Sequence, residues 1–471
     1  MVMENVLNKK AKKPARHTRD MTQGSIYKHM LGFALPILLS QLFQQLYNTA
    51  DAFIVGRLLG TEALAAVSSS GPLIHLMISF FVGISMGAGT VIARYFGAGD
   101  PDKVSKAIHT NLAFGLIASA ILTFVGVTFT PTLLRWINTD PAVMPEAVSY
   151  FRWYFAGIST IVMYNMCKGI MNAVGDSKRP LYYLIYSSVL NVVLDVLFIA
   201  GFGWGVWSAA FATVLSQASA LVLCLFHILK KGRIFSVYIS RIRIHKGIFG
   251  EIVRIGLPSG IQNSVIGLAN VVVQSQINSF GMMAMAAYGA HSKIEGFAFL
   301  PIMSFNMAIS TFISQNLGAK EYERAKKGAR FGILLAVGMA QCIGFAVLAF
   351  APQLVALFDP TPEVVELGAL QARTLAKFYF LLSFSHSVAA VCRGAGKAFV
   401  PMLVMLGIWC VVRLIYIYII MHFVGEISYI YWAYPITWLI SSAIYLVYYL
   451  RSDWVHGFEH PKKSLLSRKG A

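Results

Sequence analysis

Charged residues are scarce in this chain of 471 residues: they make up 13% of the sequence, whereas 57% of the residues are hydrophobic. A soluble globular protein carries roughly 25% charged residues, which cover its surface. The apolar residues also occur in runs of roughly 20 residues or more, the length that crosses a hydrocarbon core about 30 Å thick. The composition therefore excludes a soluble fold and indicates a polytopic membrane protein.

The sequence also lacks the motifs of enzymes, metal sites and ATP-driven pumps. Its five cysteines include no CxxC pair, and it has neither a GxxxxGK[ST] phosphate loop nor an HExxH zinc motif. We therefore expect no disulfide framework, no bound metal and no cofactor. A membrane-embedded enzyme would need a nucleophile near a base, or a metal cluster, and neither can be found, so we expect no enzymatic activity.

Acidic residues are few, and 39 Lys and Arg against 20 Asp and Glu give a net charge of +19. Thirty of the basic residues lie in the tails or in every second loop, whereas the intervening loops are neutral or acidic. This distribution is typical of the positive-inside asymmetry of membrane proteins rather than of a nucleic-acid surface. We therefore expect both termini in the cytoplasm, an even number of membrane spans and no nucleic-acid partner.

Twelve apolar segments of membrane-spanning length can be placed, which predicts an all-α fold of twelve transmembrane helices. Their approximate bounds are 31–58, 63–92, 107–130, 150–173, 181–201, 206–229, 250–280, 284–314, 329–350, 370–392, 399–423 and 428–450. The predicted organisation is a basic cytoplasmic tail (1–30), a first six-helix bundle (31–229), a basic cytoplasmic linker (230–249), a second six-helix bundle (250–450) and a second basic tail (451–471).

The two sets of six segments repeat one another. Residues 34–36, Ala-Leu-Pro, recur as residues 256–258, Gly-Leu-Pro, and Gly175 recurs as Gly396, at offsets of 222 and 221 residues. Because each unit has an even number of helices, both copies begin on the same side of the membrane and are parallel repeats. Substrate sites in folds of this kind lie between the repeats.

Polar residues form stripes inside two spans of the first half. The first span carries Gln44, Asn48 and Asp51, and the fifth carries Asn191 and Asp195, with spacings of three or four residues that put each set on one helical face. Polar stripes also occur where membrane helices pack together. A packing stripe does not usually end in an acid, however, so an internal water-filled cavity is the favoured interpretation.

The polar residues of the first half are expected to meet at one depth. At a rise of about 1.5 Å per residue, Asp51, Asp195 and Thr213 all fall in the outer part of the first bundle. Charged side chains at this depth are costly and commonly functional. Two carboxylates, the Asn191 amide and a hydroxyl could together bind a proton or Na⁺, and the carboxylates would titrate as a coupled unit.

The second half has its own polar stripe but no acid in the corresponding helix. The charged residues expected to be buried in its spans are Lys293, Glu295 and Arg413. Glu295 and Arg413 either form a structural ion pair, which is the favoured interpretation, or contact the substrate or protons. Taken over both halves, the candidate cavity or substrate residues are Gln44, Asn48, Asn263, Asn270, Gln274, Glu295, His386 and Arg413.

Several of these segments resemble the multidrug and toxic compound extrusion (MATE) family. The resemblance is carried by residues 34–56 with Asn-Thr-Ala-Asp at 48–51, by Gly-Asp-Ser-Lys at 175–178 and by Asn-Val-Val-Leu-Asp at 191–195. In the second half, Lys-Ile-Glu at 293–295 and Gln-Asn-Leu-Gly at 315–318 are similar to the family's eighth helix and the loop after it. The match covers about residues 25–450.

The resemblance implies a V-shaped, alternating-access transporter that exports cationic or amphipathic compounds in exchange for H⁺ or Na⁺. In the DinF-like branch of the family, the cation site maps onto Asp51, Asn191, Asp195 and Thr213, and an Asn on the fourth helix maps onto Asn165. In the NorM-like branch, acids on the seventh and tenth helices are important. Those helices lack acids here, so a second-bundle cation site of that kind is not expected.

Two alternatives bear on this prediction. A lipid or lipid-linked oligosaccharide flippase of the same superfamily often has a cavity dense in Arg and Lys, and few buried cations are apparent here. A channel would more naturally be a symmetric oligomer than a duplicated chain, so we expect a monomer without unitary conductance. The favoured prediction is a multi-pass antiporter of a prokaryotic plasma membrane, in contact with lipids and with small organic cations or amphipathic drugs.

Overall fold

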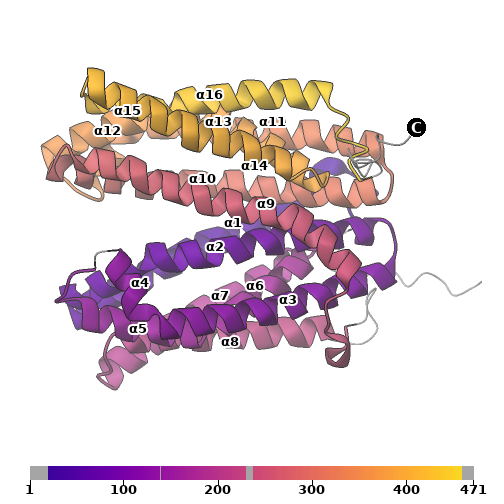
Figure 1. The fold of residues 1–471 in the computed structure, drawn as a ribbon, viewed down its shortest axis with the longest axis horizontal. Helices are drawn as coiled ribbons and strands as arrows, with labels where there is room; N and C mark the ends of the chain where they lie inside the picture. The colour runs from indigo at the N-terminus through magenta and orange to yellow at the C-terminus, as the bar shows by residue number, and fades with distance from the viewer. Residues whose placement is uncertain (1–19, 138, 230–236, 459–471) are drawn as a thin grey trace, which may run out of the picture.

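The computed structural model describes residues 20–137, 139–229 and 237–458, and these form helices without a strand (Figure 1). The outer parts of both predicted tails and residues 230–236 of the predicted linker lie outside the described residues. The first half contains α1 (Ile26–Leu59), α2 (Thr61–Gly97), α3 (Pro101–Thr128), α4 (Thr130–Trp136), α5 (Met144–Ala156), α6 (Ile158–Ala173), α7 (Lys178–Asp195), the π-helical η1 (Val196–Gly201) and α8 (Trp207–Leu229).

The short 3₁₀ helix η2 (Ile239–Arg241) precedes the second half. This half contains α9 (Lys246–Asn278), α10 (Met282–Gly318), α11 (Tyr322–Ala356), α12 (Pro362–Ala376), α13 (Tyr379–Gly394), α14 (Phe399–Met405), the π-helical η3 (Leu406–Val412), α15 (Arg413–Phe423) and α16 (Ile427–Arg451).

Nine of the described helices or merged helical segments are long and apolar enough to cross a membrane, and the bent pair α12–α13 makes ten. Two predicted spans remain, 150–173 and 250–280. The first corresponds to α5 and α6, which are separated at Gly157. The second corresponds to α9, a continuous helix that carries the polar stripe predicted in the second half. The twelve predicted spans therefore each have a helical counterpart.

The duplication is visible in the backbone as well as in the sequence. Gly60 and Gly281 adopt positive φ after the first helix of each half, and Gly175 and Gly396 do so at a later turn. Glycine adopts this conformation without the steric cost that a Cβ would impose. A π-helical segment also interrupts the same region of each half, η1 after α7 and η3 between α14 and α15. The two halves therefore share turns and helix irregularities.

The halves form two bundles, and α1 and α9 each cross from one to the other (Figure 1). Met30 and Phe33 at the start of α1 belong to the apolar core of the second bundle, whereas Val55 near its end belongs to that of the first. On α9, Ile252 packs in the first core and Ile277 in the second. Each half thus begins with a helix that is anchored in the other half.

The bundles meet most closely at the end of the molecule where α1 and α9 begin and α16 ends, which we call the basic end. A Cβ built on Gly87 would lie 2.4 Å from the backbone nitrogen of Gly256, and one on Gly83 would lie 2.3 Å from Gly260. Only glycine allows backbones to approach this closely. The contact between α2 and α9 closes the molecule at this end.

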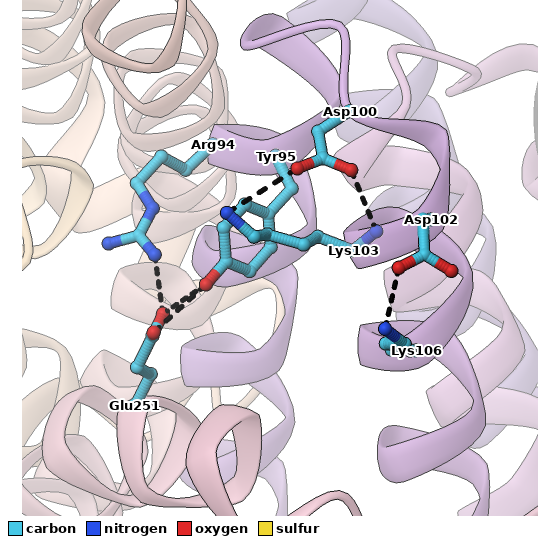
Figure 2. A network of polar contacts seen from close by, with 7 residues as sticks. All are labelled: Arg94, Tyr95, Asp100, Asp102, Lys103, Lys106 and Glu251. Carbon is cyan, nitrogen blue, oxygen red and sulfur yellow. Dashed lines mark hydrogen bonds and ion pairs between the residues drawn. The ribbon is translucent and has the colours of Figure 1, made fainter.

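A polar network reinforces the same contact (Figure 2). The Arg94 guanidinium of α2 pairs with the Glu251 carboxylate of α9, and the Tyr95 hydroxyl donates to the same carboxylate at 2.8 Å. Side chains of Arg94 and Glu251 are 18% and 39% exposed, so the pair lies at the rim of the interface. The network joins the two halves across the closed end.

Candidate functional site

Two carboxyl groups meet inside the first bundle, as the sequence predicts. Asp51 is 8% exposed and Asp195 is fully buried, and their side chains lie within hydrogen-bonding reach of each other. Asp51 comes from the outer half of α1, and Asp195 is the last residue of α7 before the π-helical η1. In the described structure, one oxygen of each carboxyl group has no hydrogen-bond partner. The pair is therefore able to share a proton or to supply oxygen ligands to a cation.

Asn191 and Thr213 complete this carboxyl site. With the Asn191 amide oriented to satisfy its neighbours, its nitrogen donates to Asp195 Oδ2 at 3.2 Å and its oxygen accepts from the Thr213 backbone N–H at 3.3 Å. Asn191 lies one helical turn before Asp195 on α7, and Thr213 comes from the adjacent α8. The four residues predicted from spacing and depth are thus brought together.

Asn165 takes a different place from these four. Its amide donates to the Ile161 carbonyl one turn earlier on α6, at 2.9 Å, and its side chain lines the space between the two bundles. Among the described hydrogen bonds, none joins Asn165 to Asp51 or Asp195. The structure therefore places Asn165 with the cavity residues.

Three tyrosines adjoin the carboxyl pair and were missed in the sequence. Tyr47, Tyr150 and Tyr154 are the tyrosines whose hydroxyl groups neighbour Asp51. Tyr47 and Tyr154 also line the central cavity, whereas neither carboxyl group does. Tyr47 and Tyr154, together with Thr213, therefore belong both to the cavity wall and to the surroundings of the carboxyl pair. The available signal was a spacing of four residues between Tyr47 and Asp51 on α1, and again between Tyr150 and Tyr154 on α5.

A central cavity of about 870 Å³ lies between the bundles. Both halves contribute to its wall, which is the position expected for a substrate site between repeats. Of the candidate residues, only Gln274 is absent from the lining, and its side chain is exposed. The candidates that line it are Gln44, Asn48, Asn263, Asn270, Glu295, His386 and Arg413.

Glu295 and Arg413 both line this cavity but do not form the predicted ion pair. The Arg413 guanidinium donates to the Thr437 hydroxyl at 2.9 Å and lies 4.4 Å from the centre of the Tyr434 ring. The nearest basic nitrogen to the Glu295 carboxylate in the described ion pairs is His291 Nε2, at 3.9 Å. Arg413 is instead held by a hydroxyl and an aromatic face, which stabilise a guanidinium without an acid.

A second cavity of about 410 Å³ continues the first toward the basic end, with Asn165, Lys168, Gln262 and His386 in both walls. Its lining includes Arg393, which lies in the last turn of α13. Neither Lys168 nor Arg393 is among the cavity residues predicted from the sequence. Among the described residues, Arg393 and Arg413 are the Lys or Arg side chains that are buried, which agrees with the expectation of few buried cations. The α13 helix extends far enough to carry Arg393 into the cavity wall.

Comparison with known protein families identifies this arrangement. The family model described as MatE matches residues 36–197 and again residues 258–419, two segments that begin 222 residues apart. The chain belongs to the MatE family. It is accordingly a multi-pass membrane transporter and not an enzyme, and the two matches coincide with its duplicated halves.

Relatives and solved structures agree with this assignment. The probable multidrug resistance protein YoeA of Bacillus subtilis (strain 168) is 28% identical over 92% of this chain and 95% of its own length. A protein of Shewanella oneidensis named as an FAD transporter is 26% identical over 72% of this chain and 75% of its own. A solved outward-facing conformation of a multidrug resistance MATE family transporter superimposes with a TM-score of 0.86 at 24% identity, covering 93% of this chain and 98% of that one. MatE membership and bacterial relatives place the protein in a plasma membrane.

Proposed function

We propose that this MatE protein is a secondary active exporter that exchanges amphipathic organic compounds for H⁺ or Na⁺. The observation that carries the proposal is the buried pair of Asp51 and Asp195, held by Asn191 and Thr213 beside a large cavity. A pair of acids deep in a transmembrane bundle is costly and marks an ion pathway by default. The basic end is taken as cytoplasmic under the positive-inside rule.

The two carboxyl groups do not line the cavity, although Thr213 of the same site does, and this arrangement supports exchange rather than co-transport through one pore. Tyr47 and Tyr154 line the cavity and also neighbour Asp51. A change at the carboxyl pair would therefore be transmitted to the cavity wall through these two side chains. Protonation or Na⁺ binding at the pair and substrate binding in the cavity would then favour different states of the same helices. Such coupling requires that each ligand bind one state more tightly than the other.

The family resemblance and the names of the relatives indicate substrates of different charge. The family resemblance implies organic cations, and YoeA is named as a probable multidrug resistance protein. Another relative is named as an FAD transporter, and FAD is an aromatic anion. An amphipathic compound with an aromatic ring system is consistent with the substrates that both relatives' names indicate. Such a ring system could also pack against the aromatic side chains of the cavity wall, Trp409, Tyr434 and Phe299.

Transport into proteoliposomes, with pH and sodium gradients imposed one at a time, tests the proposal. We expect an imposed gradient of one of the two ions to drive accumulation of an amphipathic dye, and dissipation of that gradient to stop it. Accumulation that is unaffected by either gradient would contradict coupled export. It would favour the flippase alternative if labelled lipid crossed the bilayer instead.

A further inference from the structure

The deeper cavity near the basic end contains cations without an acid to balance them. Lys168 comes from α6 of the first half and Arg393 from α13 of the second, and both line this cavity of about 410 Å³. No Asp or Glu is among its described lining residues. The carboxyl pair of Asp51 and Asp195 is outside this lining, and Glu295 lines only the wider cavity.

Arg393 is buried without a partner for its charge. Its side chain is 8% exposed, and its Nε atom makes no hydrogen bond in the described structure. Its titratable neighbours are His386, Cys392 and Tyr445, none of which is a carboxylic acid. A buried guanidinium is normally paired, because its transfer from water is otherwise strongly unfavourable.

Lys168 and His386 are further basic residues in the wall of this cavity, whose described lining has no acidic residue. Lys168 is half-buried, and no ion pair or hydrogen bond of its ammonium group occurs within the described residues. The His386 ring is 7% exposed with Nε2 unpartnered, and it packs edge-on against Phe299 and Trp409 at 5.0 and 5.1 Å between ring centres. These groups come from both halves and face the same space.

Amide groups around these cations are also incompletely bonded. Asn172 and Gln262 donate only to the sulfur atoms of Met307 and Met405, which are weak acceptors. Within the described structure, the Asn306 amide nitrogen has no acceptor. The cavity therefore offers several unsatisfied donors beside two cations, which is the composition of an anion site.

A purely structural role accounts for only part of this arrangement. Arg393 lies in the last turn of α13, where a positive charge interacts favourably with the helix dipole. Lys168 has no such position, because it lies more than one turn before the end of α6. The helix dipole also gives no reason for the absence of carboxylates from the wall.

We propose that Lys168 and Arg393 bind an anionic group of the transported compound, a carboxylate or a phosphate, while the aromatic wall of the wider cavity holds its apolar body. The proposal rests on the proposed export function and names its substrate class, an amphipathic organic anion. It reverses the charge expected from the family resemblance. Because the two cations come from opposite halves, the anion would also bridge the bundles.

Binding to the purified full-length protein tests this, with pairs of related probes of which one carries a net negative charge and the other does not. The pairs are flavin mononucleotide with riboflavin for phosphate, pyrenebutyrate with pyrenebutanol for carboxylate, and labelled phosphatidylglycerol with labelled phosphatidylcholine for a lipid headgroup. We expect at least one anionic member to bind about 10- to 100-fold more tightly than its partner, as a charge-assisted hydrogen bond provides. The pair that responds identifies the source of the anionic group.

Single-residue variants test whether the preference for the anionic probe depends on Lys168 and Arg393. Lys168→Met should abolish the preference for the anionic member while leaving affinity for the neutral one unchanged, and Arg393→Lys, which keeps the charge, should retain much of it. Lys293→Met is the matched control, because Lys293 is exposed, lies 5.3 Å from the Phe358 ring and lines neither cavity. Equal affinities within all three pairs, or a preference that survives Lys168→Met, would overturn the proposal. No ion gradient is involved, so a failure of coupled transport would leave these results intact.

Discussion

At the scale of single residues, the position of the carboxyl pair follows from helix geometry. Asp51, Asn191 and Asp195 could be predicted because fixed rise and periodicity place them at one depth and on the inner faces of their helices. Lys168 and Arg393 could not be placed in this way. A cation in the last two turns of a helix has the same sequence pattern whether its side chain reaches water or a cavity, and only the packing of the two halves decides between them.

Substitution of the carboxyl pair should separate ion coupling from folding. We expect Asp51→Asn to abolish gradient-driven transport in proteoliposomes, because Asn keeps the size of the side chain but cannot release a proton or offer a carboxylate. Substrate binding and the melting temperature should change little. Asp195→Asn should also impair coupling, and the double variant should be no worse than the more damaged single one.

The control for this experiment is Glu363→Gln, which neutralises an exposed acid in the first turn of α12, outside the cavity. It should transport at the wild-type rate. Wild-type transport by Asp51→Asn would show that Asp51 is not the coupling group.

Glu295 and Arg413 give a second prediction at this scale. Removing one member of a contacting buried ion pair costs about 3–5 kcal/mol of stability, and removing both restores much of it. Since Arg413 contacts Thr437 and Tyr434 rather than Glu295, we expect no such rescue. Glu295→Gln should melt near the wild-type temperature but transport poorly, whereas Arg413→Gln should melt lower. Recovery of the melting temperature in the double variant would instead establish a direct pair.

At the scale of helices, the crossing of α1 and α9 determines how the bundles are joined. The sequence predicts the length and order of these helices from hydropathy, and it predicts their duplication from the repeated Pro36 and Pro258 motifs. It does not reveal that each helix starts in the core of the other half. That exchange depends on contacts between residues more than 200 positions apart, for example Met21 N–H with Gln315 Oε1.

The glycine contact between α2 and α9 is testable at this scale. Gly87→Ala places a methyl group against the Gly256 backbone and Ile252 O, neither of which can rotate away. We expect a loss of about 1–3 kcal/mol in the stability of the state closed at the basic end, the usual cost of overpacking. Gly250→Ala on α9 is the control, since a Cβ there meets nothing within 4 Å. Cysteine accessibility at the basic end should rise for Gly87→Ala only.

At the scale of the whole molecule, one end is closed by glycine packing and by the Arg94–Glu251–Tyr95 network, while the large cavity lies farther along the interface. This is the arrangement expected of one of the two states of an alternating-access transporter. Switching to the other state must break these contacts. The sequence could not indicate which state is populated, because the same helices form both.

The polar network should therefore influence the balance between the two states. Glu251→Gln removes the charge that Arg94 pairs with, and a partly exposed pair of this kind contributes about 0.2–1 kcal/mol. We expect a modest rise in the population open at the basic end, measured by distances between spin labels on α2 and α9. Glu323→Gln is the control, because its pair with Lys326 lies within one helix. An equal rise in both variants would exclude a specific role for the network.

Exchange of substrate against a cation is tested most directly by the reverse experiment, in which only a substrate gradient is imposed on proteoliposomes. An outward gradient of the anionic or amphipathic substrate should drive H⁺ or Na⁺ in the opposite direction, and Asp51→Asn should abolish that ion movement while substrate still binds. Substrate movement without any counter-flow of H⁺ or Na⁺, or an ion flux that persists in Asp51→Asn, would contradict exchange at the carboxyl pair.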